Sequence, residues 1–186
     1  SREHVTIALL WHTMMRTGGI HALDVEDYHP EERYVEVRHR AETGTPVKNK
    51  ESGERLVALS DQVCALLDDW IAVRHPAVTD DHGRNPLIST RQGRISKSTI
   101  RKYVYNFTRP CVVGQDCPHN RGPDQCVALG SSAASKCPSS VSPHAIRRGS
   151  ITHSLTRDMP DKVVSHRANV SQAVIDQHYD RRTERE

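Results

Sequence analysis

The residues best suited to chemistry stand toward the end of the 186-residue chain. His144 and Arg147 follow Pro143, and on a helix two residues three apart share one face. Tyr179 stands 32 residues beyond Arg147. An imidazole and a guanidinium on one face bind an anion, and a phenol becomes a nucleophile when it loses its proton. Taken singly, each pattern fits a solvated basic helix face or a half-buried tyrosine equally well.

Three cationic side chains earlier in the chain complete the candidate site. Arg16 follows an apolar-rich segment, and Lys48 and Lys50 lie in a polar connection between two alternating, strand-like segments. Residues two apart on a strand point to one face, so either lysine can serve one site. An arginine, a lysine, a His-x-x-Arg pair and a tyrosine together offer phosphate clamps, a general acid and a nucleophile.

In this order the residues and their flanking segments resemble the tyrosine recombinase (phage integrase) family over most of the chain. Segments 44–50, 142–150 and 178–180 (GTPVKNK, SPHAIRRGS and HYD) look most like archaeal, especially haloarchaeal, virus and plasmid integrases. The resemblance implies an α+β fold, a mainly helical catalytic domain with a small antiparallel sheet or hairpin. It also implies site-specific DNA recombination, in which strands are cleaved and rejoined through a covalent 3′-phosphotyrosyl intermediate.

The resemblance assigns a role to each residue. Arg16 and Arg147 clamp the non-bridging oxygens of the scissile phosphate, and Tyr179 attacks the phosphorus. Lys48, preferred over Lys50 from its place in the resembling segment, protonates the departing 5′ oxygen. His144 donates to a non-bridging oxygen or assists proton movement at the tyrosine. No cofactor is expected for catalysis.

Two positions depart from the family pattern. The family has an acidic residue three after the first arginine, where this chain has Gly19. A Gly-His pair precedes the family's tyrosine, but an ungapped count places it on residues 169 and 170, and Val170 has no side-chain donor. His166 lies one turn earlier and is the preferred replacement if residues 161–170 are helical. The alternatives are His178, or no histidine at this contact.

Four cysteines fall within a polar stretch at about residues 110–140 that has little apolar periodicity. In a protein expected to be cytosolic, such a cluster favours metal over disulfides. We expect one structural Zn²⁺ held by four thiolates, with His119 as a reserve ligand. Free cysteines and disulfides remain the alternatives, and Cys64 is expected in the core. The four predicted ligands are Cys111, Cys117, Cys126 and Cys137.

The composition fits a nucleic-acid partner without requiring one. The formal net charge is +3, and 20 of the 26 basic residues are arginine, which grips phosphate bidentately. A GC-rich genome would produce the same bias. No segment has the roughly 20 apolar residues of a membrane span, and no signal peptide is visible. We therefore expect a cytoplasmic, nucleoid-associated protein.

The elements that position these residues are predicted from hydrophobic periodicity and turn residues. A glycine pair at 18–19 is expected to end or kink the first helix. The strands are expected to form a hairpin, and a short strand is allowed at 86–89. The predicted helices are 4–16, 61–74, 96–109, one from 143 and one from 171 that carries Tyr179; the predicted strands are 34–38 and 55–59.

We expect residues 1–186 to form one catalytic domain, without the N-terminal DNA-binding domain that family members usually carry. The expected partner is double-stranded DNA at attachment sites, with a monomer free in solution and a tetramer on paired sites for the full-length protein. No membrane partner is expected. A type IB topoisomerase, which relaxes a single duplex with similar residues, is one alternative. A non-catalytic zinc-containing DNA-binding protein is the other.

Overall fold

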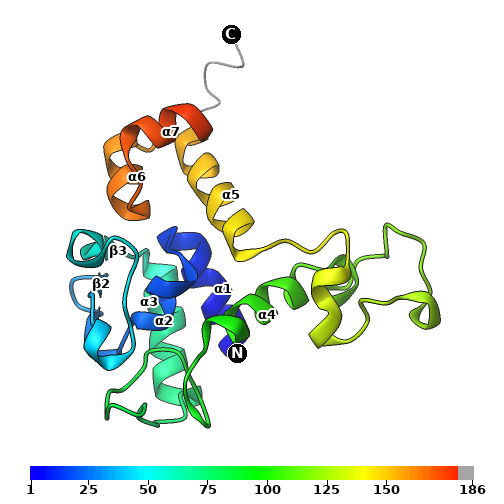
Figure 1. Ribbon diagram of the computed structural model, residues 1–186, viewed down its shortest axis with the longest axis horizontal. Helices are drawn as coiled ribbons and strands as arrows, with labels where there is room; N and C mark the ends of the chain where they lie inside the picture. Colours follow the sequence, from blue (N-terminus) through cyan, green and yellow to red (C-terminus); the bar gives the residue numbers. More distant parts are fainter. Residues whose placement is uncertain (180–186) are drawn as a thin grey trace.

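Helix α1 (Arg2–Thr13) lies at the centre of the fold (Figure 1). The computed structural model describes residues 1–179. The Ser1 hydroxyl caps the helix by accepting a hydrogen bond from the His4 N–H, and its apolar face, including Leu9 and Leu10, is buried. The helix ends three residues before the predicted position because Met14 adopts a left-handed conformation with φ 57°.

A short helix, α2 (Thr17–Ala22), follows directly and corrects the prediction for the glycine pair. Gly18 and Gly19 lie inside this helix and do not end α1. Gly19 is buried against Met15, and a β-carbon at this position would lie 3.3 Å from the Met15 side chain. The two glycines therefore allow α2 to pack closely on the turn that carries Arg16.

A three-stranded antiparallel sheet confirms the two predicted strands and adds a short third one. Its order is β1 (Tyr28–His29), β2 (Tyr34–Val37) and β3 (Arg55–Ala58). Val35 pairs with Val57, and both are buried, as alternation along half-buried strands requires. The β2–β3 connection holds two 3₁₀ turns, η2 (Ala41–Thr43) and η3 (Lys50–Gly53), while η1 (Val25–Asp27) precedes β1.

The middle of the chain packs helices against this sheet. Helix α3 (Asp61–Asp69) begins at its Ser60 cap and continues as a π-helical turn, η4 (Trp70–Arg74). A two-stranded hairpin, β4 (Ser89–Thr90) and β5 (Gly93–Arg94), replaces the single short strand allowed at 86–89. Helix α4 (Lys97–Phe107) is capped by Ser96, close to the start predicted for the helix at 96–109.

The cysteine-rich stretch forms no α-helix or strand. It contains three 3₁₀ turns, η5 (Pro110–Val113), η6 (Pro123–Gln125) and η7 (Ser131–Lys136). In Figure 1 it extends past the end of α4, on the opposite side of the molecule from the sheet.

Three helices complete the described chain: α5 (Pro143–Thr156), α6 (Asp161–Ala168) and α7 (Gln172–His178). Serine hydroxyls cap α5 and α7 at Ser142 and Ser171. Tyr179 is the C-terminal cap of α7 and not a residue inside a helix, which corrects the prediction. The mainly helical fold with small antiparallel sheets agrees with the sequence prediction. Within residues 1–179, no helix is long and apolar enough to cross a bilayer.

The apolar core has two parts that meet at the end of α1. The larger cluster joins α1, the sheet, α3 and α4, and it includes Met15. The smaller cluster joins α5, α6 and α7, and it includes Met14 and Tyr179. Adjacent methionines therefore enter different clusters, and Arg16 follows at their boundary.

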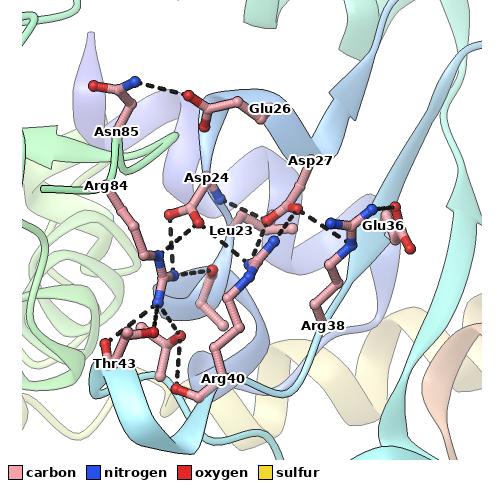
Figure 2. A network of polar contacts seen from close by, with 12 residues as sticks. Leu23, Asp24, Glu26, Asp27, Glu36, Arg38, Arg40, Thr43, Arg84 and Asn85 are labelled. Carbon is pink, nitrogen blue, oxygen red and sulfur yellow. Dashed lines mark hydrogen bonds and ion pairs between the residues drawn. The ribbon is translucent and has the colours of Figure 1, made fainter. Parts of the chain in front are cut away.

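A buried set of ion pairs, the aspartate–arginine network, holds the β2–β3 connection to the β4–β5 side of the fold. Figure 2 shows Arg84 and Arg40 directed at Asp24, and the Arg84 Nε lies 2.8 Å from its carboxylate. Arg40 also lies 2.6 Å from Asp27. The network consists of Asp24, Asp27, Arg40, Asp80, Arg84 and Arg94.

Candidate active site

An open cleft of about 270 Å³ lies where the α1–α2 turn, α4 and the start of α5 meet. Three of the predicted site residues line it, although they are up to 131 positions apart in sequence (147 − 16). The cleft is cationic, and within residues 1–179 no carboxylate lines it. Its lining residues are Arg16, Thr17, Arg101, Tyr105, Ser142, Pro143, His144 and Arg147.

Arg147 is the most buried cation of the cleft, with 2% of its surface exposed. Its Nη1 donates to the Met14 carbonyl, which the left-handed cap of α1 leaves free of the helix. Its Nη2 is buried and has no hydrogen-bond partner among the described residues. Burial, with repulsion from Arg16 and Arg55, lowers the pKa of this guanidinium to about 10 against an opposing effect of Tyr179. The side chain is still a cation at neutral pH, so its free N–H is suited to an anion.

Arg16 is held without the acidic residue that the family pattern supplies. Its Nη1 donates to the carbonyl of Asn169 at 3.4 Å, across 153 positions of sequence. Asn169 ends α6 in a left-handed conformation, φ 50°, which turns this carbonyl toward the α1–α2 turn. An acidic side chain at position 19 would meet Met15, because that position is buried. A neutral carbonyl thus orients Arg16 and leaves its charge unneutralised.

Arg55, at the start of β3, is a candidate site residue that the sequence analysis missed. Its Nε donates to the Arg167 carbonyl at 2.9 Å and its Nη1 to the Gly53 carbonyl at 2.7 Å. Burial and the nearby Arg16 lower its pKa to about 10. An arginine that opens a strand normally lies in solvent, so no local sequence signal indicates this position. Its proximity to Arg16 and Arg147 arises only when α6 packs on β3.

Tyr179 lies beside this cation cluster and is 7% exposed. Its N–H donates to the Ile175 carbonyl at 2.9 Å, which closes α7, and its ring packs in the smaller core cluster with Met14. The Met14 carbonyl is the group that binds Arg147, so the tyrosine and the arginine share one support. Asp180, which completes the HYD segment, is outside the described residues.

His144 and the two lysines are exposed. His144 lines the cleft from the first turn of α5. Lys48 lies in a turn and Lys50 opens η3 with φ 51°, so the two lysines lie in the connection between β2 and β3, as predicted, but not on one face of a strand. Neither lysine lines the cleft. A β-carbon at Gly53 would overlap the Lys48 carbonyl. The tight fold of residues 48–53, which we call the lysine turn, therefore requires a glycine at position 53.

The geometry removes the helical argument for His166. Helix α6 ends at Ala168, and the left-handed Asn169 follows, so His166 and Val170 are not one turn apart on a continuous helix. His166 is exposed and its ring makes no hydrogen bond within residues 1–179, while His178 is exposed at the end of α7. Val170 packs against the smaller core cluster. The role of His166 therefore stays a prediction for experiment.

All four cysteines of residues 110–140 carry free thiols, and they line one small cavity of about 20 Å³. Among the described residues, no three His, Cys, Asp or Glu side chains are grouped closely enough to hold a metal ion. The structure therefore brings the predicted ligands around one cavity without placing them at ligand distance.

The chain belongs to the phage integrase family, whose model matches residues 1–116. That match includes Arg16 and the lysine turn, and it ends before His144, Arg147 and Tyr179. No curated protein sequence is similar enough to the chain to count as a match.

Solved structures of recombinases share the fold over nearly the whole chain. A crystal structure of the XerA recombinase has a TM-score of 0.65 at 18% identity, covering 96% of this chain and 51% of that one. The Tn1549 transposon integrase in complex with a circular intermediate DNA has a TM-score of 0.63 at 19% identity, covering 96% and 53%. A lambda integrase dimer bound to a core site has a TM-score of 0.55 at 17% identity, covering 97% and 53%. The chain therefore spans about half the length of these proteins.

Proposed function

We propose that residues 1–186 form the catalytic domain of a site-specific DNA recombinase of the integrase type. One observation carries the proposal: Arg147 is buried with an unpaired N–H, beside Arg16 and Tyr179, and no carboxylate in the described chain neutralises it. Such a cluster is costly unless an anion occupies it. A DNA phosphate next to a tyrosine hydroxyl meets that need and is the reacting group of strand transfer.

The chemistry is a transesterification at phosphorus. The Tyr179 hydroxyl loses its proton and attacks the scissile phosphate, the bond to the 5′ oxygen breaks, and a 3′-phosphotyrosyl link forms. The departing 5′ oxygen takes a proton and becomes a hydroxyl. The 5′ hydroxyl of a partner strand then attacks the same phosphorus, and the tyrosine oxygen leaves and is reprotonated. One phosphodiester is exchanged for another, so the reaction needs no nucleotide hydrolysis.

The cationic residues act on the phosphate charge during both steps. Arg16 and Arg147 bind the non-bridging oxygens, where negative charge develops in the transition state. Arg55, which repels both of these arginines electrostatically, adds to the same positive potential. His144 donates to a non-bridging oxygen from the rim of the cleft or assists proton movement at Tyr179. His166 is retained as the proposed last phosphate contact.

The general acid comes from the exposed lysine turn. We assign the role to Lys48, with Lys50 as the alternative, because both ammonium groups stand in solvent where bound DNA would meet them. The Asn49 side chain of this turn donates to the Asn169 side chain at 3.5 Å. Since the Asn169 carbonyl also binds Arg16, this residue links the lysine turn to the phosphate clamp.

The remaining features of the proposal follow from the partner. Double-stranded DNA with attachment sites is the substrate, and the full-length protein acts as a tetramer on paired sites and as a monomer when free. Action on DNA places it in the cytoplasm with the nucleoid. The segments that resemble haloarchaeal integrases support a virus or plasmid of such a host as its source.

The test is covalent trapping on suicide DNA duplexes that carry a nick near the attachment site. We expect a protein–DNA adduct from the unmodified protein and none from Tyr179→Phe, with DNA binding retained because only the phenolic oxygen is lost. Tyr105→Phe is the matched control, since Tyr105 lines the cleft, which Tyr179 does not, and the variant is expected to keep the adduct. An adduct from Tyr179→Phe, or none from the unmodified protein on its own site, would overturn the proposal.

A second readout separates recombination from relaxation of one duplex. Two duplexes of different length that carry the site are expected to yield exchanged products. Adducts and relaxed plasmid without exchange would identify a type IB topoisomerase activity.

A further inference from the structure

The cysteine-rich segment, residues 110–140, lacks an apolar core of its own. Its only buried apolar residues are Ala128 and Ala134, which are too small to stabilise a fold of this length. Four larger apolar side chains are exposed: Val112, Val113, Val127 and Leu129. The segment nevertheless has a defined course through three 3₁₀ turns and lies beyond the end of α4 (Figure 1). Its turns η5 and η7 contact α4, but little apolar surface is buried there, so a further interaction is needed to hold the rest of the segment.

The four thiols surround a single cavity within this segment. Each comes from a different turn, and all four are free and at least partly exposed. Pro118 and Pro138 follow two of the cysteines and also line the cavity, which stiffens the turns that carry the sulfurs. A cavity of about 20 Å³ is close to the volume of one ion or water molecule.

A buried cation stands beside this cavity without a carboxylate partner. Arg109 is 4% exposed and lines the cavity, and its Nη1 donates to the carbonyls of Ala128 and Leu129. Its Nε donates to the Asn106 carbonyl at 3.2 Å. All these acceptors are neutral, and Arg121 adds a second positive charge at the cavity. A divalent cation held by four thiolates carries a net charge of −2, which these two arginines balance.

Hydrogen-bond donors surround the sulfur of Cys117. Backbone N–H groups of Arg121 and His119 are directed at this sulfur. Thiolate is the form that binds metal, and N–H donors and cations are the surroundings that stabilise it. His119 itself is engaged through its Nε2 with the Ser139 hydroxyl at 2.9 Å, so a sulfur-only ligand set needs no displacement of this pair.

We propose that Cys111, Cys117, Cys126 and Cys137 bind one structural Zn²⁺ ion that holds the segment together. Binding converts four thiols and Zn²⁺ into a tetrathiolate complex with release of four protons. Tetrahedral coordination at about 2.3 Å brings the sulfurs to about 3.8 Å from one another, so the turns close inward around the cavity when the ion enters.

The proposed metal would also stiffen the approach to the catalytic helix. The segment ends at residue 140, and the Val141 N–H donates to the Thr108 hydroxyl at 3.0 Å, immediately before the Ser142 cap of α5. His144 and Arg147 lie in the first two turns of α5. A closed zinc site would fix this entry between α4 and α5 and keep the two side chains in the cleft.

The experiment measures metal content and ligand type in protein purified under reducing conditions without chelator. We expect about one Zn²⁺ per chain, and replacement by Co²⁺ should produce the near-ultraviolet absorption of sulfur-to-cobalt charge transfer. Cys126→Ser should lower zinc content at least tenfold and abolish that absorption. Cys64→Ala removes a thiol that is buried in α3, outside the segment, and should keep both signals.

His119→Ala decides the ligand set. It should keep a full zinc content with four thiolates, and loss of zinc from this variant would overturn the sulfur-only assignment. Metal-free protein with four alkylatable thiols that gives no charge-transfer band with Co²⁺ would overturn the proposal, as would disulfides among these cysteines. Because the readouts are metal content and absorption, either outcome leaves the proposed recombinase activity to its own test.

Discussion

The molecule uses arginine in two opposite ways. In the aspartate–arginine network, Arg94 lies 2.7 Å from Asp80, and Arg84 and Arg40 contact Asp24 (Figure 2). In the cleft beside α5, Arg147 and Arg16 donate to backbone carbonyls, and no aspartate or glutamate of residues 1–179 lines this cleft.

We interpret the arginines that pair with aspartates as structural and the arginines that contact only carbonyls as ligand-binding. A buried cation that is paired with a carboxylate is held rigidly, and its charge is neutralised and not available to a ligand. A buried cation that donates to a neutral carbonyl is oriented but keeps its charge. The buried charge lowers the stability of the folded protein, and binding of an anion offsets that loss. For Arg147, burial and repulsion from Arg16 lower the pKa of the guanidinium to about 10, so its charged form is destabilised by an amount on the order of a few kcal/mol. Four experiments test whether the two groups of arginines differ in this way.

The largest effect is expected for Arg147→Met, which removes the charge and keeps an unbranched side chain. Cleavage of suicide DNA should fall about 10²- to 10⁴-fold, because a donor to the transition state is lost. The free energy of unfolding should stay within about 1 kcal/mol of the unmodified protein or rise, since an unpaired buried charge is removed. Gel assays of adduct formation and urea unfolding measure the two. Arg148→Met, an exposed neighbour, is the control, and a loss of several kcal/mol from Arg147→Met would place this arginine with the structural ones.

Asp24→Asn should show the reverse pattern. Asp24 is 4% exposed and pairs with Arg40, Arg84 and Arg94. The substitution removes its negative charge and leaves these three arginines without that counter-charge. We expect a loss of about 3 kcal/mol in the free energy of unfolding, measured in urea. Residual folded protein should cleave DNA at nearly the normal rate.

The control for that experiment is Asp61→Asn, which breaks an exposed ion pair with Arg33 and should cost less than about 1 kcal/mol. Equal losses from the two aspartate variants would show that the network contributes no more than a surface pair.

Inorganic phosphate should stabilise the cleft by supplying the missing counter-ion. At ten times the dissociation constant the stabilisation is about 1.4 kcal/mol, which for a chain of this size raises Tm by roughly 3–6 °C. The rise should disappear in Arg147→Met and persist in Asp24→Asn. A thermal shift that is unchanged in Arg147→Met would mean that phosphate binds elsewhere.

The smallest effect is expected for His166→Ala. The side chain is exposed and lies outside the cleft, so it reaches a DNA phosphate only from the surface of α6. Single-turnover cleavage should slow about tenfold, with DNA affinity unchanged. Cleavage at the unmodified rate, at equal stability, would remove His166 from the site and leave the arginines and His144 as the phosphate contacts.

Features that depend on residues close together in the sequence could be predicted from the sequence. The two longer strands follow from alternation of apolar residues, and α5 follows from the Ser142 cap with Pro143 in its first turn. His144 and Arg147 share a face because helix geometry alone requires it. The order of the motifs indicated the phage integrase family, to which the chain belongs.

Other features depended on contacts between distant segments. The position of Arg55 at the cation cluster arises from the packing of α6 on β3, and the support of Arg16 by Asn169 arises from the left-handed end of α6. No periodicity in either segment encodes these contacts. The connection that carries Lys48 and Lys50 was predicted between the two strands, but its tight turn was not, because neither left-handed position, Asn49 or Lys50, is a glycine.

The amino-acid sequence alone established which groups are present: two arginines predicted to bind phosphate, a lysine pair, a His-x-x-Arg motif, a tyrosine and four clustered cysteines. The tertiary structure decided which of the cations are neutralised. Asp24 and Asp27 follow Arg16 closely in sequence, yet they pair with Arg40, Arg84 and Arg94, while Arg16 meets a carbonyl 153 positions away. Charge pairing depends on distance in space, and only the folded chain sets that distance.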